Sequence, residues 1–311
     1  MTRKFGLPAL LIAAFLVAGV AWAGDGKAGS TYLPLLDIGP GAGPSAMSAY
    51  VGAPGDMWSL TYNPAGLANI DRLKLGVSQI EWQLDTSFTY LGVGLPRGEG
   101  GLAMGVAYFD KGSIEQQSDD LGFVNDETAE AYDFAFIGGY GFDVPNVCNL
   151  AGGVSGHVIQ ATLDDESATA IGLNMGFLYG LMEQQVHVGL AVRNLGTKLK
   201  FIEEEEEQAL TYAGGISYTT LPDQIQYVDL LIGLDAAMPK GQDVQVGVGG
   251  EVWVYEMLAL RVGYSTASES GNLRYGAGFR YSDFQLDYTY TDFDEYNEDT
   301  HRISLTMAFG D

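Results

Sequence analysis

Charged side chains that could bind a solute or pair with one another recur at every second position in the later part of the chain. If Val186, Val188 and Leu190 lie on one face of an extended segment, His187 and Arg193 lie on the other. The same parity along later segments collects five arginines and four carboxylates: Arg193, Asp229, Asp235, Glu251, Arg261, Arg274, Arg280, Asp287 and Arg302. Because an unpaired charge in a confined space is costly, this enrichment predicts paired charges. The pairs would form either a network that holds another segment in place, which we favour, or a ladder of sites for a solute.

Other chemistry finds little support in the sequence. The three histidines, His157, His187 and His301, are scattered, and no nucleophile elbow is present. The Gly-rich stretches lie inside extended segments with no following helix, so they do not predict a phosphate-binding loop. The single Cys148 excludes an internal disulfide framework and a Cys-based zinc site. We therefore expect no enzyme activity, catalytic residue, cofactor or resident metal, although the acidic run at 203–207 could hold divalent cations.

Composition narrows the possible partners. The chain has 311 residues, with 40 acidic and 15 basic side chains and a formal net charge of -25. Nucleic acid is excluded as a partner, because binding a polyanion needs a basic patch and the sequence has none. Hydrophobic residues make up 47% of the chain and charged residues 18%, which is too apolar for a disordered acidic chain. The protein must therefore bury or embed much of its surface.

The first residues predict export. Residues 2–4 form a short basic start, residues 7–20 are apolar, and residues 21–23 read Ala-Trp-Ala, a small-residue cleavage site. We expect a signal peptide over residues 1–23, cleaved after Ala23. A membrane-anchor helix is the alternative, and it is weaker because the apolar run is shorter than the roughly 20 residues that a span needs.

The elements that position the charged residues are extended segments in which apolar and polar side chains alternate. Fourteen such segments follow residue 72, an even number, each near the length of a tilted membrane strand. We predict an all-β fold, a 14-stranded antiparallel transmembrane β-barrel over residues 72–311, with a water-soluble β-sandwich as the alternative. The predicted strands are 72–82, 84–95, 101–109, 131–142, 150–162, 168–179, 185–194, 209–219, 226–237, 243–255, 257–265, 272–281, 283–291 and 301–309.

Loop lengths and aromatic positions favour the barrel. If the first connection is extracellular, the outward loops at 110–130, 195–208 and 292–300 are long and acidic, whereas most intervening turns are short. Outer-membrane barrels pair short periplasmic turns with long outer loops. The run at 203–207 is expected to lie in a solvated outer loop. Aromatic residues near strand ends fit girdles at the two membrane interfaces: Trp82, Tyr108, Phe109, Tyr140, Phe142, Tyr179, Tyr255, Tyr264 and Tyr281.

The segment before the first strand, residues 24–71, is rich in Gly, Ala and Pro and contains AYVGAPGDMWSLTYNPAGLAN at 49–69. It resembles the hatch of the PorV/PorQ family, relatives of the FadL-type fourteen-stranded outer-membrane proteins, whose pattern is Met-Gly-x-Ala-Tyr, an acidic residue, then Asn-Pro-Ala-Gly-Leu. Ser48 stands where that family usually has Gly. The resemblance continues in VRNLGTKLKF, LALRVGYST, LRYGAGFRY, LDYTYTDF and HRISLTMAF and covers essentially the whole chain after residue 23. The matching hatch residues are Met47, Ala49, Tyr50, Asp56, Asn63, Pro64, Ala65, Gly66, Leu67 and Ala68.

The resemblance implies a hatch inside a barrel in the outer membrane of a diderm bacterium, surrounded by lipid, whose rearrangement would open a path. It implies binding or passage of small amphipathic or hydrophobic solutes. The alternative is a type IX protein secretion component or cargo shuttle of the PorV kind, with other type IX secretion proteins as partners. From the residues themselves, Asn63 can accept a backbone N–H and Pro64 suits the first helical position, so Asn63 to Leu67 favour a structural turn over a ligand contact.

The inner face of the predicted barrel bears on the choice of solute. A fatty-acid route needs a largely apolar pocket, and the inner face of the later strands is charged, which argues against long-chain fatty acids. Small residues are expected to leave room along the same wall, at Gly247, Gly249, Gly263, Gly276 and Gly278.

Overall fold

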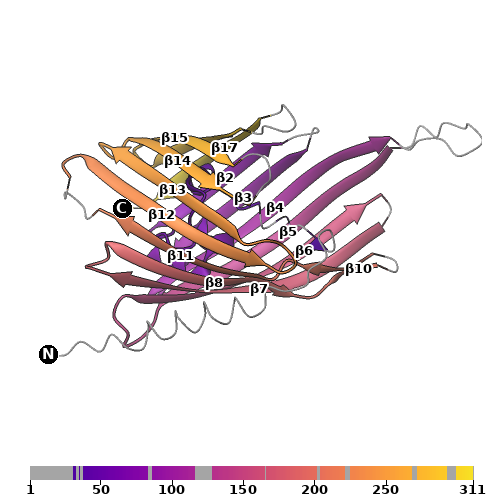
Figure 1. The fold of residues 1–311 in the computed structure, drawn as a ribbon, viewed down its shortest axis with the longest axis horizontal. Helices are drawn as coiled ribbons and strands as arrows, with labels where there is room; N and C mark the ends of the chain where they lie inside the picture. The colour runs from indigo at the N-terminus through magenta and orange to yellow at the C-terminus, as the bar shows by residue number, and fades with distance from the viewer. Residues whose placement is uncertain are drawn as a thin grey trace, which may run out of the picture.

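The computed structural model describes residues 31–32, 35, 38–82, 86–115, 128–164, 166–201, 204–220, 225–267, 272–292 and 299–310. Fourteen antiparallel strands form a closed barrel, in which the last strand pairs with the first (Figure 1). This confirms the predicted fold class and excludes the sandwich. The barrel strands are β2 (Leu73–Glu81), β3 (Ser87–Pro96), β4 (Gly100–Glu115), β5 (Thr128–Asp143), β6 (Leu150–Leu163), β7 (Glu166–Leu181), β8 (Val186–Gly196), β11 (Thr211–Thr219), β12 (Val228–Pro239), β13 (Gln245–Val254), β14 (Leu258–Ser265), β15 (Leu273–Tyr281), β16 (Phe284–Thr291) and β17 (Thr300–Phe309).

The barrel strands carry large apolar side chains on the outside. In β7, Ile171, Leu173 and Phe177 are each more than half exposed, at 54%, 56% and 54%. In β17, Ile303 is exposed, whereas Arg302 and Ser304 on either side of it are buried. A protein surrounded by water would place these side chains the other way round. The alternation therefore gives the polarity of a barrel whose outer wall faces lipid.

Two regions expected as plain loops contain strands. β4 and β5 extend beyond the predicted ends and shorten the 110–130 connection, and a bulge interrupts their pairing between Asp110 and Ser113. The 195–208 connection contains β9 (Leu199–Phe201) and β10 (Glu204–Gln208), which form a three-stranded sheet with β1 (Thr31–Tyr32). The prediction of a solvated loop at 203–207 was therefore wrong for residues 204–207, which pair with β9 and β1; residue 203 lies outside the described residues.

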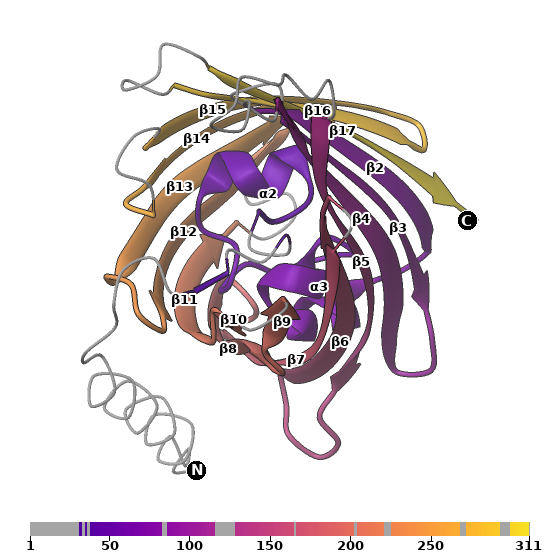
Figure 2. The same ribbon diagram turned by 90° about the vertical axis from the view of Figure 1, so that its right-hand side faces the viewer.

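A hatch fills the space inside the barrel (Figure 2). We use this name for residues 38–71, the main described part of the predicted 24–71 segment; the predicted signal peptide at 1–23 lies outside the described residues. The hatch contains α2 (Ala42–Met47), α3 (Ser59–Tyr62) and the 3-10 helix η1 (Pro64–Asn69). Helices this short gain little from their own hydrogen bonds, so packing against the barrel wall must stabilise them. All six residues of α2 are buried.

The aromatic girdle was predicted correctly in part. Tyr140 stacks on Phe142 with ring centroids 5.9 Å apart, and Tyr255 is 63% exposed on the outer wall. Trp82 and Phe109, in contrast, pack against the apolar cluster inside the barrel, so their assignment to the girdle was wrong. A position near a strand end does not tell whether a side chain lies on the inner or the outer face of the barrel. Moving by one residue along the strand places the side chain on the opposite face.

Among the described residues, no helix is both long and apolar enough to cross a membrane. The same described residues contain no group of three or more His, Cys, Asp or Glu side chains arranged to hold a metal ion.

Candidate functional site: the hatch and the barrel lumen

Glycines of the barrel wall allow the hatch backbone to lie directly against the strands. A Cβ atom at Gly249 would collide with the carbonyl oxygen of Met47, and one at Gly263 would collide with that of Ala46. Gly247 contacts the backbone at Ser48 in the same way. The expectation that these glycines leave free room was therefore wrong, because the hatch backbone occupies it. A glycine is required where two backbones approach this closely.

Asn63 connects the hatch to itself and to the wall. Its Oδ1 accepts the backbone N–H of Ala65 at 3.2 Å and caps η1, with Pro64 at the first helical position, as the residue types predicted. Its Nδ2 donates to the carbonyl oxygens of Val51 at 2.8 Å and of Phe177 in β7 at 3.1 Å. One buried side chain thus joins two hatch segments and a barrel strand.

Asp235 of β12 holds a hatch segment through its backbone. Its Oδ2 accepts the N–H groups of Tyr50 at 2.6 Å and Val51 at 2.7 Å, and its Oδ1 accepts that of Gly52 at 3.4 Å. Hydrogen bonds to an ionised acceptor are roughly twice as strong as neutral ones. This carboxylate, predicted as part of a lumenal network, satisfies hatch amides and makes no ion pair among the described residues.

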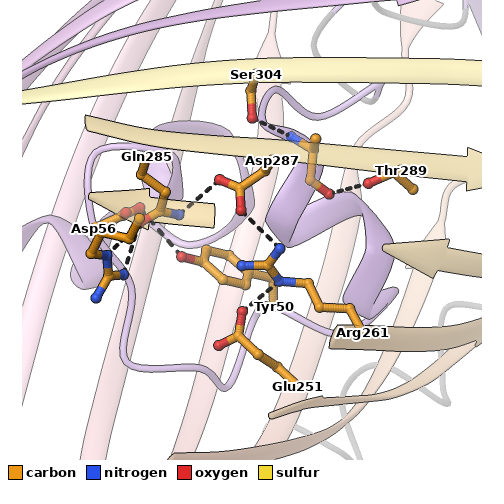
Figure 3. A network of polar contacts seen from close by, with 10 residues as sticks. Tyr50, Asp56, Glu251, Arg261, Gln285, Asp287, Thr289 and Ser304 are labelled. Atoms are coloured by element: carbon orange, nitrogen blue, oxygen red, sulfur yellow. Dashed lines mark hydrogen bonds and ion pairs between the residues drawn. The ribbon is translucent and has the colours of Figure 1, made fainter. Parts of the chain in front are cut away.

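Hydroxyl side chains of the wall, which the sequence analysis did not single out, make further hatch contacts. Ser304 Oγ accepts the N–H of Ala42 at 3.0 Å, and Thr289 Oγ1 donates to the carbonyl oxygen of the same residue at 2.6 Å (Figure 3). Ser155 and Ser217 donate to the carbonyl oxygens of Leu60 and Gly52. These residues occupy inward positions on β6, β11, β16 and β17. That parity was the available signal, but it does not identify their hatch partners.

Three predicted lumenal charges form one ionic cluster. Arg261, only 5% exposed, donates from Nε to Glu251 and from Nη1 to Asp287 at 2.8 Å (Figure 3). Gln285 extends the cluster by donating to Asp287 at 2.7 Å and accepting from Arg280. Separating one partner from a buried ion pair leaves an uncompensated charge, which is strongly destabilising. We therefore expect these side chains to stay paired and this cluster to be rigid.

The remaining predicted charges differ in their surroundings. Arg280 lies over the ring of Trp253, with its guanidinium carbon 4.2 Å from the ring centroid. Asp229 has the inward parity of β12, but no hydrogen bond or ion pair to it is found within the described part of the chain. Arg274 donates to the carbonyl oxygen of Ser45 at 3.2 Å, and Arg302 donates to those of Gly39 and Ile38.

Several hatch side chains have a perturbed pKa, among them Asp56 and Tyr62. Burial raises the pKa of the Asp56 carboxyl, an effect opposed by Lys74 and by the Trp58 N–H, which donates to Asp56 Oδ1 at 2.9 Å. Burial also raises the pKa of the Tyr62 hydroxyl, and Arg302, Arg274 and Arg193 act in the opposite direction. Asp56 is therefore more readily protonated in the docked hatch than in an exposed chain.

The lumen has a second, apolar wall that the later strands did not reveal. Inward side chains of β2 to β6 form one buried cluster with the hatch residues Met57, Trp58, Leu60 and Leu67. The charged inner face that was predicted for the later strands is found on β12 to β17, and it does not extend to β2 to β6. We call the following strand residues the apolar wall: Ile80, Phe88, Tyr90, Ala103, Ala107, Ala135, Ile137 and Ile159.

Comparison with known proteins establishes the fold. No protein-family model and no curated protein matches the sequence. Among solved structures, the chain is similar to the P. putida toluene transporter TodX, with a TM-score of 0.56, 10% identity, and coverage of 86% of this chain and 98% of that chain. A TodX deltaS2 mutant, titled a monoaromatic hydrocarbon channel, gives a TM-score of 0.59 at 11% identity, covering 88% of this chain and 99% of that chain. The predicted likeness to FadL-type barrels is thus confirmed at the level of fold.

Proposed function

We propose that this protein is an outer-membrane channel through which small hydrophobic or amphipathic solutes pass when the hatch moves. The observation that carries the proposal is the apolar wall. A water-filled porin has a polar interior, whereas here one side of the lumen presents Ile80, Phe88 and Ile137 next to the hatch. Two similar structures carry titles that name a toluene transporter and a hydrocarbon channel.

The hatch must move for such passage, and its contacts suit a reversible plug. Many contacts between the wall and the hatch backbone are single hydrogen bonds, such as those from Ser217 and Ser155. Each typically contributes only about 0.5–1.5 kcal/mol net, because water can replace either partner. Displacement of part of the hatch is therefore less costly than opening the barrel ladder.

A reversible crosslink tests the proposal. The Cβ of Ala49 lies 3.1 Å from the position that a Cβ would take at Gly233 in β12, so a backbone shift of a few tenths of an ångström would give the roughly 3.5–4.5 Å of a disulfide. Ala49→Cys with Gly233→Cys, made in a Cys148→Ser background, would lock the hatch when oxidised. Cells producing the parent should take up labelled toluene several-fold faster than cells without it. The oxidised variant should lose this gain and a reductant should restore it.

The control for this test is the amount of folded barrel in the outer membrane, followed by the shift in gel mobility on heating in detergent. Uptake that stays at the level of cells lacking the protein, with folded barrel present, would refute the channel. The PorV-like secretion role implied by the resemblance predicts that outcome, so the same assay separates the two functions.

A further inference from the structure

Three inward glycines form a row across neighbouring strands on the apolar side of the lumen. Gly76 of β2 pairs with Gly92 of β3, and Gly92 pairs with Gly105 of β4, so the three lie side by side at one level of the wall. All three are buried. Glycine weakens the interior of a strand and often marks a place where a ligand or another backbone comes close to the sheet. We call these three residues the glycine row.

Two hatch side chains cover the glycine row. A Cβ at Gly76 would lie 2.8 Å from Cζ2 and from Cη2 of Trp58, and 2.9 Å from Cε of Met57. Another part of the same indole ring lies against Gly41 of the hatch, where a Cβ would be 3.0 Å from Cδ2 of Trp58. The indole therefore contacts a glycine of the wall and a glycine of the hatch, with no side chain at either position. The wall at this level thus accepts a flat aromatic ring.

The side chain of Tyr90 in β3 lies along the same row. A Cβ at Gly105 would collide with its hydroxyl oxygen. A Cβ at Gly92 would lie 3.1 Å from this oxygen and also 3.1 Å from Cε of Met57, so the hydroxyl and the Met57 methyl group flank one point of the row. The Tyr90 ring is also close to Trp58, with ring centroids 5.9 Å apart. A group that takes the place of Met57 would therefore lie beside the Tyr90 hydroxyl.

The Tyr90 hydroxyl is buried and has no hydrogen-bond partner among the described residues. Buried polar groups are nearly always paired, so this group needs an explanation. Packing does not require the oxygen, because Phe88, two residues earlier on the same face of β3, is buried in the same apolar cluster without one. Each of the two side chains is only 1% exposed. Within the described residues, the docked hatch thus leaves unused the hydrogen bond that Tyr90 can donate.

We propose that the glycine row binds a flat aromatic solute that carries a neutral hydrogen-bond acceptor, such as a ketone, ester or ether oxygen, and that the Tyr90 hydroxyl donates to this acceptor. The solute occupies the row after Met57 and Trp58 withdraw with part of the hatch. This inference rests on the proposed function and names the solute class that the lumen prefers. Plain hydrocarbons lack the acceptor, and puckered saturated rings fit a flat floor less well. Tyr90 is therefore the specificity-determining residue.

Three small probes separate the acceptor from the ring. Acetophenone has a carbonyl group where ethylbenzene has a methylene, and cyclohexyl methyl ketone keeps the carbonyl group but replaces the flat ring with a puckered one. Binding of each labelled probe to the protein in lipid nanodiscs is measured by equilibrium dialysis, and empty nanodiscs correct for partition into lipid. The parent should bind acetophenone about two- to tenfold more tightly than ethylbenzene, as expected for one net hydrogen bond. It should also prefer acetophenone to cyclohexyl methyl ketone.

Two variants test the two parts of the site. Tyr90→Phe removes only the oxygen, so the preference for acetophenone over ethylbenzene should disappear; Tyr140→Phe is the control, because its hydroxyl donates to the Arg97 carbonyl oxygen at an exposed position. Gly92→Ala raises the floor of the row and should remove the preference for acetophenone over cyclohexyl methyl ketone. A looser hatch would change the affinity for both ketones alike, so this ratio reports the shape of the row. Gly250→Ala, where a Cβ has no atom nearer than 3.9 Å, is its control.

Heat-modifiable gel mobility shows that each variant still forms the barrel, and the comparison of probes in the parent needs no variant. Equal binding of acetophenone and ethylbenzene by the parent overturns the inference, and so does a preference for acetophenone that survives in Tyr90→Phe. These failures are distinguishable from failure of the channel. Fast toluene uptake with no preference among the bound probes would retain the channel and remove this site. Acetophenone binding that depends on Tyr90, with no toluene uptake, would retain the site and refute passage.

Discussion

Asp235 Oδ2 accepts the backbone N–H of Val51 at 2.7 Å, which ties the centre of the hatch to barrel strand β12. The same oxygen accepts the N–H of Tyr50 at 2.6 Å. A carboxylate that holds two adjacent amides fixes the backbone direction of this segment regardless of its side chains. The wall thus recognises the hatch largely through main-chain groups, and several predictions test that relationship.

The first prediction concerns this carboxylate. Asp235→Ala should leave the Tyr50 and Val51 amides without their acceptor, at a cost of about 1–3 kcal/mol for each buried donor. Hydrogen exchange at both amides should then accelerate by roughly tenfold or more, while the barrel stays heat-modifiable. Asp229→Ala is the control, since Asp229 shares the strand and the inward parity. Similar exchange in the two variants would show that Asp235 does not hold the hatch.

The second prediction uses neighbouring glycines of β13. A Cβ at Gly249 would collide with the Met47 carbonyl oxygen, whereas one at Gly250 has no atom nearer than 3.9 Å. Gly249→Ala should push α2 away from the wall and raise hydrogen exchange at residues 46–48 and single-channel conductance. Gly250→Ala should leave both unchanged. If Gly249→Ala behaves like the parent, the hatch does not rest on this strand.

The third prediction separates the two roles of Asn63. Asn63→Ala should remove the η1 cap, worth about 0.5–2 kcal/mol, together with both donated hydrogen bonds. Asn63→Asp keeps the cap acceptor but turns the donor toward Val51 and Phe177 into a second acceptor. We expect the Asp variant to loosen the hatch at least as much as the Ala variant, measured as the maleimide reactivity of a buried Ser45→Cys thiol in the Cys148→Ser background. Asn69→Ala, at an exposed position, is the control. Parent-like reactivity in Asn63→Asp would mean that only the cap matters.

The fourth prediction concerns pH. Burial raises the pKa of Asp56, with Lys74 opposing and Asp287 adding to the shift, so the docked hatch binds a proton more readily than the released hatch does. Docking should therefore become more favourable as the pH falls from neutral through the raised pKa, and less favourable as the pH rises through it. Hydrogen exchange at the Trp58 amide, corrected for intrinsic rate, should slow on acidification. Asp56→Asn should reduce this dependence; an unchanged pH profile in that variant would assign it to another group.

Local sequence determined the barrel. Period-two alternation specifies which side chains share a face of a strand. Counting the alternating segments predicted fourteen strands without any knowledge of contacts, and the barrel has fourteen. The cap at Asn63 and Pro64 was predictable for the same reason, because its donor lies two residues away. The inward parity of Arg261 and Asp287 followed from alternation too, and strand register then brought their side chains into contact.

Tertiary structure decided what the inward residues contact. Alternation alone could not separate Arg261, which lies between two carboxylates, from Arg302, which donates to hatch carbonyl groups, because the partners are distant in the chain. It could not place the 195–208 segment in a small sheet with β1, nor turn Phe109 inward. The strand register of the barrel and the packing of the hatch decide these contacts together, because they determine which backbone segment lies opposite each inward side chain. The sequence by itself determined the wall and its polarity, and only the folded chain decided which lumenal charges form ion pairs and which contact the hatch backbone.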